Sequence, residues 1–128
     1  MLLFLDDDPN RAAITYQRMS PEERQKTIWC QTVEETIVTL RDYKDELEVV
    51  MLDHDLGGQT YVNSKREDCG MEVIRYLEKY QNENPKEFEA FVDVNFIVHT
   101  YNTYAGHKMV ERLQKLGINR VVYQPFGT

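Results

Sequence analysis

The chain has 128 residues, a length that suits one domain with a hydrophobic core of its own. Its 41% apolar and 29% charged residues are ordinary for a globular domain, and no apolar run reaches the roughly 20 residues of a membrane span. The net charge of −7 excludes a non-specific nucleic-acid binder with a basic face, although not an enzyme that reaches a nucleic-acid end through a metal. Cys30 and Cys69, without a secretion signal, predict reduced thiols and a cytoplasmic location.

The first half of the chain alternates apolar strands with helices. Met1–Leu5 is an apolar run typical of a buried parallel strand, and a helix is predicted from Pro9 to about Met19. A helix-capping signal at Ser20 predicts a restart. The next predicted elements are a strand at Thr27–Gln31, a helix behind the capping box at Thr32, and a strand at Leu47–Leu52.

The second half opens with a break in this alternation. Residues 56–69 form a long polar loop, and a loop of that length inside a compact domain is usually functional or mobile. The later predicted elements are, in chain order, a helix from Gly70, a polar segment at Asn82–Glu89, a strand at Val92–Val98, a helix at Tyr104–Leu116 and a strand at Asn119–Tyr123.

Alternation of this kind predicts an α/β fold: one domain over residues 1–128, with a doubly wound, five-stranded parallel sheet. Functional groups in such sheets gather at the carboxyl ends of the strands. Polar residues stand at those ends here: Asp6, Asp7, Asp8, Asp53, His54, Asp55, His99, Thr100, Asn102 and Gln124. The sequence therefore predicts a functional site at one edge of the sheet.

The acidic residues of this set predict a divalent-metal site. Carboxylates at adjacent strand ends repel one another unless a cation lies between them or one of them stays protonated. Oxygen ligands favour hard cations, so we expect Mg²⁺ or Mn²⁺ on Asp6, Asp7 and Asp53, with Asp55 as a further ligand. The alternative is that these acids only cap the helices that follow, which is the role expected for Asp8.

Two histidines accompany the acids. His54 lies between two aspartates and points away from them if the chain stays extended, which favours a packed histidine. His99 ends the fourth strand, where a neutral imidazole can bind metal and an imidazolium can bind phosphate or act as an acid. A histidine that merely orders its loop is equally compatible with that position.

Four motifs, in order and over nearly the whole chain, resemble response-regulator receiver domains. Leu3–Pro9 is similar to their first strand and acidic pair, and Val49–Asp53 to the strand that ends in the phosphoacceptor aspartate. Gly70–Ile74 resembles the opening of their third helix, and Val121–Phe126 their fifth strand and Lys-Pro-Phe ending. The resemblance implies a flavodoxin-like sheet with strand order 2-1-3-4-5, here without the fifth helix.

Departures from the receiver pattern point to one branch. Gln124 stands where receivers have a lysine that pairs with the phosphoryl group, so we expect no ordinary phosphoacceptor signalling. The motifs Asp53–Gly57 and His99–Asn102 resemble the cyclic-phosphate-processing receiver-like domains. That resemblance implies work on cyclic phosphate ends of RNA or nucleotides, in RNA repair or phage–host conflict.

Two hypotheses follow for the function. The first is metal-dependent binding or processing of a phosphate ester, with Asp53 and His99 as the catalytic residues. Its substrate-binding residues are His54, Thr100, Asn102, Gln124 and, on the long loop, Lys65 and Arg66. The second is a pseudo-receiver that catalyses nothing and binds a partner protein, which the loss of the lysine supports.

The fifth strand predicts an exposed apolar row. Val121 and Tyr123 point to one face of the sheet and Val122 to the other, and no fifth helix is expected to cover them. Either segment 9–26 folds over the row, or a second copy of the chain covers it. We expect the homodimer, because Pro21 breaks the first helix early.

Overall fold

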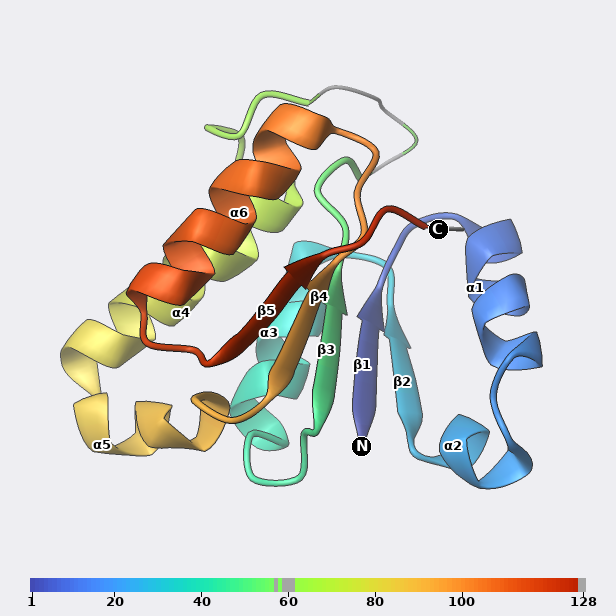
Figure 1. Ribbon diagram of the computed structural model, residues 1–128, viewed down its shortest axis with the longest axis horizontal. Coiled ribbons are helices and arrows are strands. Elements are labelled where there is room, and N and C mark those ends of the chain that lie inside the picture. The colour runs from blue at the N-terminus through green and yellow to red at the C-terminus, as the bar shows by residue number, and fades with distance from the viewer. Residues whose placement is uncertain (57, 59–61, 127–128) are drawn as a thin grey trace.

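Five short parallel strands form one sheet in the order β2-β1-β3-β4-β5, which confirms the predicted topology (Figure 1). The computed structural model describes residues 1–56, 58 and 62–126. The strands are β1 (Leu2–Leu5), β2 (Thr27–Cys30), β3 (Val49–Leu52), β4 (Asn95–Val98) and β5 (Arg120–Tyr123). In the strand pairing, Leu5 lies beside Cys30 and Leu52, and Leu52 lies beside Val98. The carboxyl ends of the strands are therefore level with one another.

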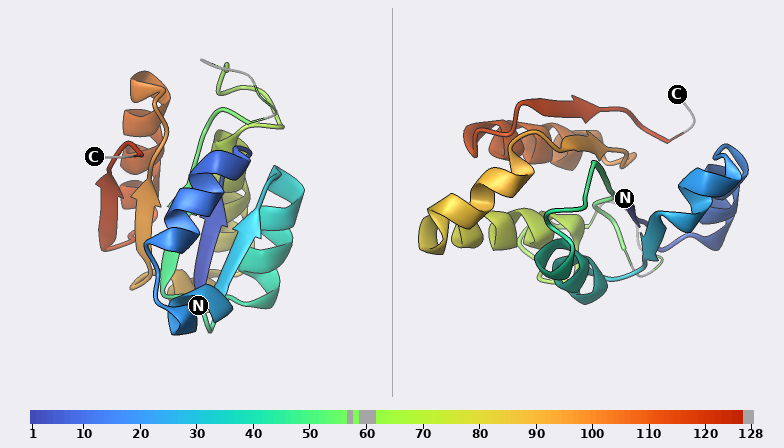
Figure 2. Two further views of the ribbon diagram at one scale, coloured as in Figure 1. Left: turned by 90° about the vertical axis from the view of Figure 1, so that its right-hand side faces the viewer. Right: turned by 90° about the horizontal axis from the view of Figure 1, so that it is seen from below.

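Helices cover the two faces of the sheet unequally (Figure 2). The helices are α1 (Pro9–Gln17), α2 (Pro21–Gln25), α3 (Val33–Asp42), α4 (Gly70–Glu83), α5 (Pro85–Phe88), η1 (Glu89–Phe91) and α6 (Thr103–Lys115). Helices α3, α4 and α6 pack on one face, and α1 lies on the other at the β1–β2 side. No helix in the described part of the chain is long and apolar enough to cross a membrane.

The core lies between the sheet and the three helices on its covered face. Alternate strand residues, such as Leu3, Val50 and Phe96, are fully buried there. Met71 and Leu77 of α4 meet them from the helical side. Because both elements place apolar side chains with the period of their secondary structure, the strand and helix patterns converge on one core.

Three elements differ from the boundaries that the sequence predicts. The third and fourth strands are shorter than expected and begin at Val49 and Asn95. The polar segment after Asn82 is helical, because α4 continues to Glu83 and α5 and η1 follow. Phe88 and Phe91 of these two short helices are almost fully buried, with ring centroids 5.6 Å apart. Burial of these rings stabilises helical turns in a segment whose polar residues favour a loop.

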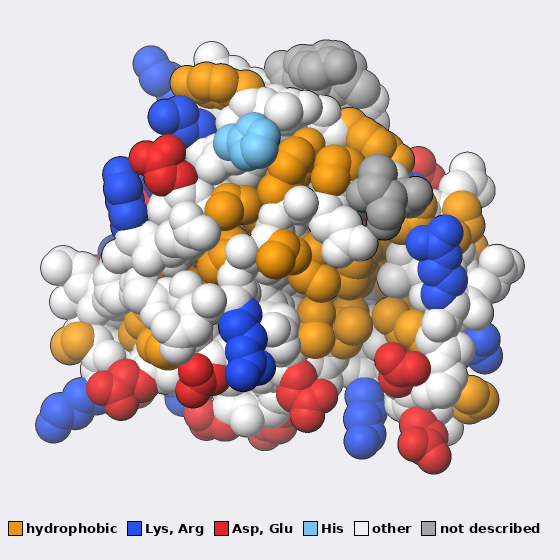
Figure 3. Space-filling view, viewed as in Figure 1, with side chains coloured by type: hydrophobic (Ala, Val, Ile, Leu, Met, Phe, Trp, Pro, Cys, Tyr) orange, Lys and Arg blue, Asp and Glu red, His pale blue; other side chains and the backbone are white. Residues whose placement is uncertain are grey.

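The other face of the sheet carries an apolar row that α1 borders but does not fully cover. Val122 of β5 is 51% exposed, and Met51 and Ile97 are partly exposed beside it. Figure 3 shows hydrophobic side chains gathered on this face. Helix α1 ends at Gln17, and the Trp29 side chain on β2 donates a hydrogen bond to the Asp6 carbonyl. Thr15, Arg18 and Met19 line a cavity together with Met51 and Ile97, so segment 9–26 borders the row and leaves Val122 half exposed.

Candidate functional site

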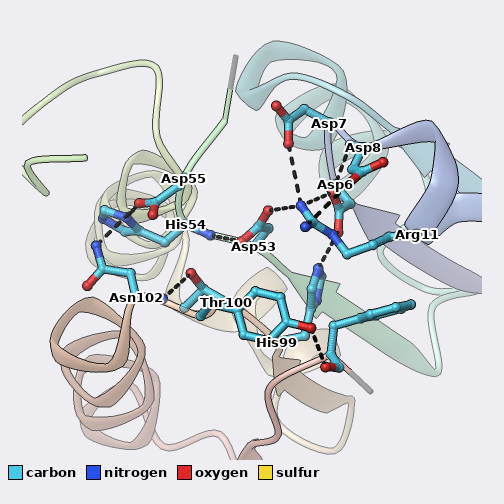
Figure 4. Close-up of polar contacts among 12 residues, drawn as sticks. Asp6, Asp7, Asp8, Arg11, Asp53, His54, Asp55, His99, Thr100 and Asn102 are labelled. Atoms are coloured by element: carbon cyan, nitrogen blue, oxygen red, sulfur yellow. Dashed lines mark hydrogen bonds and ion pairs between the residues drawn. The ribbon is translucent and has the colours of Figure 1, made fainter. Parts of the chain in front are cut away.

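Polar side chains from three strand ends meet at the carboxyl edge of the sheet, as predicted (Figure 4). They surround an open cavity of about 460 Å³. Its lining includes three aspartates, Asp7, Asp53 and Asp55, together with Thr100 and Asn102. The level strand ends bring these groups together, although up to 95 residues of chain separate them.

Asp6 is the most buried carboxylate of the site. It is fully buried and accepts hydrogen bonds from the Nε and Nη2 atoms of Arg11, each at 2.8 Å, and from the Asp8 backbone N–H at 2.9 Å. Burial by itself raises the pKa of Asp6, but the hydrogen bonds from His99 and Arg11 lower it to about 2. Asp6 is therefore charged at neutral pH.

Arg11 supplies a positive charge that the sequence analysis did not identify. Its guanidinium lies among four carboxylates, because Nη2 is also 3.5 Å from Asp53 Oδ2 and 3.8 Å from Asp7 Oδ1, and Nη1 is 3.5 Å from Asp8 Oδ2. The available signal was helical spacing, since Arg11 on α1 follows Asp8 by three residues and Asp7 by four. The acidic cluster thus contains a cation of its own, the Arg11 guanidinium.

Asp53 lies beside Asp6, but its pKa is shifted in the opposite direction. Its Oδ1 accepts the His54 backbone N–H at 2.8 Å, and the residue is only 4% exposed. Burial and the neighbouring charge of Asp6 raise the pKa of Asp53 to about 6, although His99 and Arg11 oppose the shift. Asp6, Asp53 and His99 offer one ligand atom each, and these atoms lie within 4.8 Å of one another.

His99 faces Asp6 and packs on the core. Its Nε2 is 3.1 Å from Asp6 Oδ2, and its ring stacks on Phe4 with centroids 5.1 Å apart. Its Nδ1 is buried and has no hydrogen-bond partner among the described residues. The contact places a proton on Nε2, because the charged Asp6 carboxylate can only accept a hydrogen bond. In this arrangement His99 donates to Asp6 and orients it.

Asp55 belongs to a second polar network beside the cavity. Its Oδ1 lies 2.7 Å from His54 Nδ1 and accepts from the Val62 backbone N–H at 3.1 Å and from Asn102 Nδ2 at 3.3 Å. Asn102 also caps α6 through its Oδ1. Asp55 lines the cavity but lies outside the cluster of Asp6, Asp53 and His99.

His54 is not brought to the cavity. Its ring is fully buried, with Nδ1 on Asp55 and Nε2 2.9 Å from Ser64 Oγ. Burial by itself lowers the pKa of His54, but interactions with Cys69 and Asp55 raise it overall. Its predicted role in substrate binding does not fit this position, because both ring nitrogens face the protein interior. Its role here is to join the loop before α4 to Asp55.

Two of the predicted substrate-binding residues lie on the long loop, outside the cavity wall. Lys65 and Arg66 are exposed, and the guanidinium of Arg66 contacts the Asp68 carboxylate at 2.9 and 2.6 Å. Arg75 of α4 donates to the carbonyls of Ser64 and Arg66 and so fastens the loop to the helix.

Gln124 does not line the acidic cavity. It is exposed and lines another cavity, of about 210 Å³, together with Met51, Ile97 and His99, which also belongs to the acidic cluster. Thr100, by contrast, is at the acidic cavity, where its Oγ1 accepts the Asn102 backbone N–H at 3.1 Å. Asp7 is there too, with its Oδ2 accepting the Gly58 N–H at 2.6 Å.

The fold agrees with comparisons to known proteins. Residues 1–115 match the family described as the cyclic-phosphate processing receiver domain. The structure resembles the receiver domain of the Francisella response regulator 1452, at 19% identity and a TM-score of 0.57, over 98% of this chain and 84% of that one. It also resembles the signal receiver domain of a Vibrio parahaemolyticus protein described as a Luxo repressor, at 17% identity and a TM-score of 0.55, over 97% and 77%. No curated protein matches the sequence.

Proposed function

Because the chain belongs to the cyclic-phosphate-processing receiver domain family, we propose that it binds and processes a phosphate ester with the help of a divalent cation. The ester is a cyclic phosphate, on a nucleotide or at the end of an RNA. The reaction site is the cavity at the carboxyl edge of the sheet. The single observation that carries the proposal is the convergence of Asp6, Asp53 and His99, of which Asp53 lines that cavity.

The donor set fits Mg²⁺ or Mn²⁺. Asp6 and Asp53 contribute carboxylate oxygens, which hard cations prefer. The raised pKa of Asp53 supports the fit, because two buried carboxylates so close together favour the uptake of a positive charge. When bound there, the cation would polarise a phosphoryl oxygen and lower the charge that opposes attack on phosphorus. Asp7 and Asp55 line the same cavity and are the further ligands that the proposal allows.

The protein's own uncharged polar groups would hold the ester in the cavity. Its lining includes Thr100, Tyr101 and Asn102. The Asn102 amide is held by Asp55 and the first turn of α6, so its orientation is fixed before a ligand arrives. His99 acts through Asp6: its Nε2–H keeps that carboxylate turned toward Asp53.

Metal binding provides the direct test. We expect Mn²⁺ to bind the wild type, measured by calorimetry, and Asp53→Asn to weaken binding by at least about tenfold, because the variant removes a ligand charge. Asp42→Asn is the matched control, since Asp42 is a half-exposed carboxylate paired with Arg41 on α3. An isotherm that is the same in Asp53→Asn and the wild type contradicts the proposal.

Turnover is tested separately. With Mn²⁺ present, we expect 2′,3′-cyclic nucleotides to be opened to monoesters by the wild type and not by Asp53→Asn, as followed by ³¹P NMR. Metal binding without turnover would leave a binding site for phosphate esters and would remove the enzymatic part of the proposal.

A second candidate function is a non-catalytic module that binds a partner protein. The exposed apolar row around Val122 favours it, because such surfaces mark interaction sites. Gln124 also lies beside a cavity on that face rather than at the acidic site. Absence of both Mn²⁺ binding and turnover would leave this candidate as the better one.

A further inference from the structure

Resting on the proposed function, we propose that Arg11 couples metal binding to phosphate binding. In the metal-free protein its guanidinium holds the cation position of the acidic site. When a metal takes that position, the released guanidinium becomes the group that binds the phosphate. Arg11 would then be a phosphate-binding residue as well as an internal counter-ion.

The position of Arg11 overlaps the candidate metal site. Arg11 Nε and Nη2 each donate to one carboxylate oxygen of Asp6 at 2.8 Å, and Nη2 also lies 3.5 Å from Asp53 Oδ2. Figure 4 shows the guanidinium between Asp6, Asp53 and Asp7. A metal bound by Asp6 and Asp53 therefore has to displace at least one of these contacts. Arg11 and the metal compete for the same carboxylates.

Displacement leaves the guanidinium facing the cavity. Arg11 lines that cavity, and its side chain is 25% exposed, so it has an open side. Its backbone stays in place on α1, where its carbonyl accepts a hydrogen bond from Thr15 Oγ1 at 2.8 Å. The other carboxylates within reach, Asp7 and Asp8, are 3.8 and 3.5 Å away and do not form a paired fork.

A phosphate is the anion that fits this released group. The planar guanidinium binds two oxygens of a phosphate in parallel, as it now binds the two oxygens of Asp6. Among the described residues that line the cavity, Arg11 is the one Lys or Arg. A phosphate entering an otherwise acidic cavity thus has one cationic side chain to meet, and that side chain is free only when Asp6 has another partner.

The arrangement predicts two linked effects on affinity. Arg11 weakens metal binding in the absence of phosphate, because its contacts to Asp6 must be broken. It strengthens metal binding in the presence of phosphate, because the released fork gains a new partner. By thermodynamic linkage, metal and phosphate raise each other's affinity, by at least about fivefold for a typical coupling.

The experiment measures Mn²⁺ affinity with and without inorganic phosphate, from the EPR signal of free Mn²⁺ and with protein-free controls for phosphate complexes. We expect Arg11→Gln to bind Mn²⁺ alone about tenfold more tightly than the wild type, since charged hydrogen bonds to Asp6 are lost. The same variant should lose the effect of phosphate. Arg18→Gln is the matched control, with the same charge change at the end of α1, where Arg18 lies over Phe126; it should behave as the wild type.

Arg11→Lys provides a second test if Arg11→Gln fails to fold. A lysine keeps the charge but has no fork, so we expect nearly wild-type affinity for Mn²⁺ alone and a reduced phosphate effect. In the wild type, the Arg11 Nε–H signal in ¹⁵N NMR should move when Mg²⁺ and phosphate are added together. A signal that does not move overturns the proposal without any variant.

The outcomes separate this inference from the function on which it rests. If wild type and Arg11→Gln bind Mn²⁺ equally, with the same phosphate effect, Arg11 has no coupling role while the metal site stands. Tighter Mn²⁺ binding in Arg11→Gln with an undiminished phosphate effect also overturns the inference. If neither the wild type nor any variant binds Mn²⁺, and the Arg11 Nε–H signal does not move when phosphate is added, both the proposed function and the inference are wrong.

Discussion

The pKa values of two neighbouring aspartates in the site are shifted in opposite directions. Asp6 receives the Arg11 fork and the His99 N–H, which together bring its pKa to about 2 despite complete burial. From the described residues, Asp53 receives a backbone N–H and a longer contact from Arg11, and burial and the charge of Asp6 raise its pKa to about 6. The hydrogen bonds from His99 and Arg11 to Asp6 thus decide which carboxylate carries the charge most firmly.

This asymmetry predicts how stability depends on pH. Asp53 has a raised pKa, so the folded protein binds its proton more tightly than the unfolded chain, and its ionisation lowers stability as pH rises through about 6. We expect Asp53→Asn, in the presence of a chelator, to raise the free energy of unfolding by about 2 kcal/mol near pH 8. The gain should vanish near about pH 4, where the carboxyl is protonated in the folded wild type.

Urea unfolding of the wild type and Asp53→Asn at both pH values measures this effect. The contribution of Asp6 has the opposite sign, because its lowered pKa stabilises the fold above its unfolded value of 3.8 and that stability is lost as pH falls toward 2. It is common to both proteins and cancels in the comparison. An equal difference at the two pH values would contradict the raised pKa of Asp53.

At the scale of elements, the first turn of α4 is pressed against the end of β3. The Gly70 N–H donates to the His54 carbonyl at 2.8 Å. A Cβ at position 70 would lie 1.8 Å from the Asp53 carbonyl oxygen, closer than two non-bonded heavy atoms can approach. Glycine is therefore required here for a close approach of two backbones, and this contact holds the Asp53–Asp55 segment against the helix.

Substitution of this glycine should damage the fold and the site together. We expect Gly70→Ala to lower the free energy of unfolding by about 3 kcal/mol or more, since the clash is with backbone that cannot turn aside. Gly106→Ala is the matched control in α6, where the added Cβ would lie 2.6 Å from the ring of Tyr123. That ring is part of a side chain, so relaxation makes the cost smaller. Urea unfolding ranks the two, and the reverse order would refute the argument.

At the scale of the whole molecule, the two faces of the sheet differ. The face beneath α3, α4 and α6 is buried, whereas the row of Met51, Ile97 and Val122 on the other face is open to solvent in part. After β5 the described chain continues only through residues 124–126, which form no helix. The alternation of Val121, Val122 and Tyr123 places apolar side chains on both faces whatever covers them.

The exposed row leads us to expect a two-fold dimer at micromolar concentration. Light scattering of the wild type should give about twice the 15.2 kDa of one chain. Val122→Lys puts a charge at the exposed end of the row, on the edge strand β5, and should return the protein to a monomer without loss of stability, because Val122 is half exposed. A wild-type protein that scatters as a single chain would rule the dimer out.

The sequence alone was sufficient for the presence of the parallel strands and for the edge of the sheet at which the site lies, whereas the order of the strands was implied by the resemblance to receiver domains. The strands and the edge follow from local patterns, since a strand of alternating or fully apolar residues reveals itself within about five positions. The polar residues that follow the strands could then be placed together, because parallel strands end at one edge. This reasoning located seven residues of the site: Asp6, Asp7, Asp53, Asp55, His99, Thr100 and Asn102.

The partners of those residues were decided only by the tertiary structure. In the sequence, Arg11 looks like an ordinary charged residue on the exposed side of a helix. No local sequence pattern indicates that its guanidinium binds the Asp6 carboxylate. His54 turns inward, and Gln124 lies at another cavity, because the path of the chain after each strand depends on contacts made elsewhere. A local pattern determines which face or edge a residue occupies. Its side-chain contacts depend on distances between segments far apart in the chain, and these exist only once the core has packed.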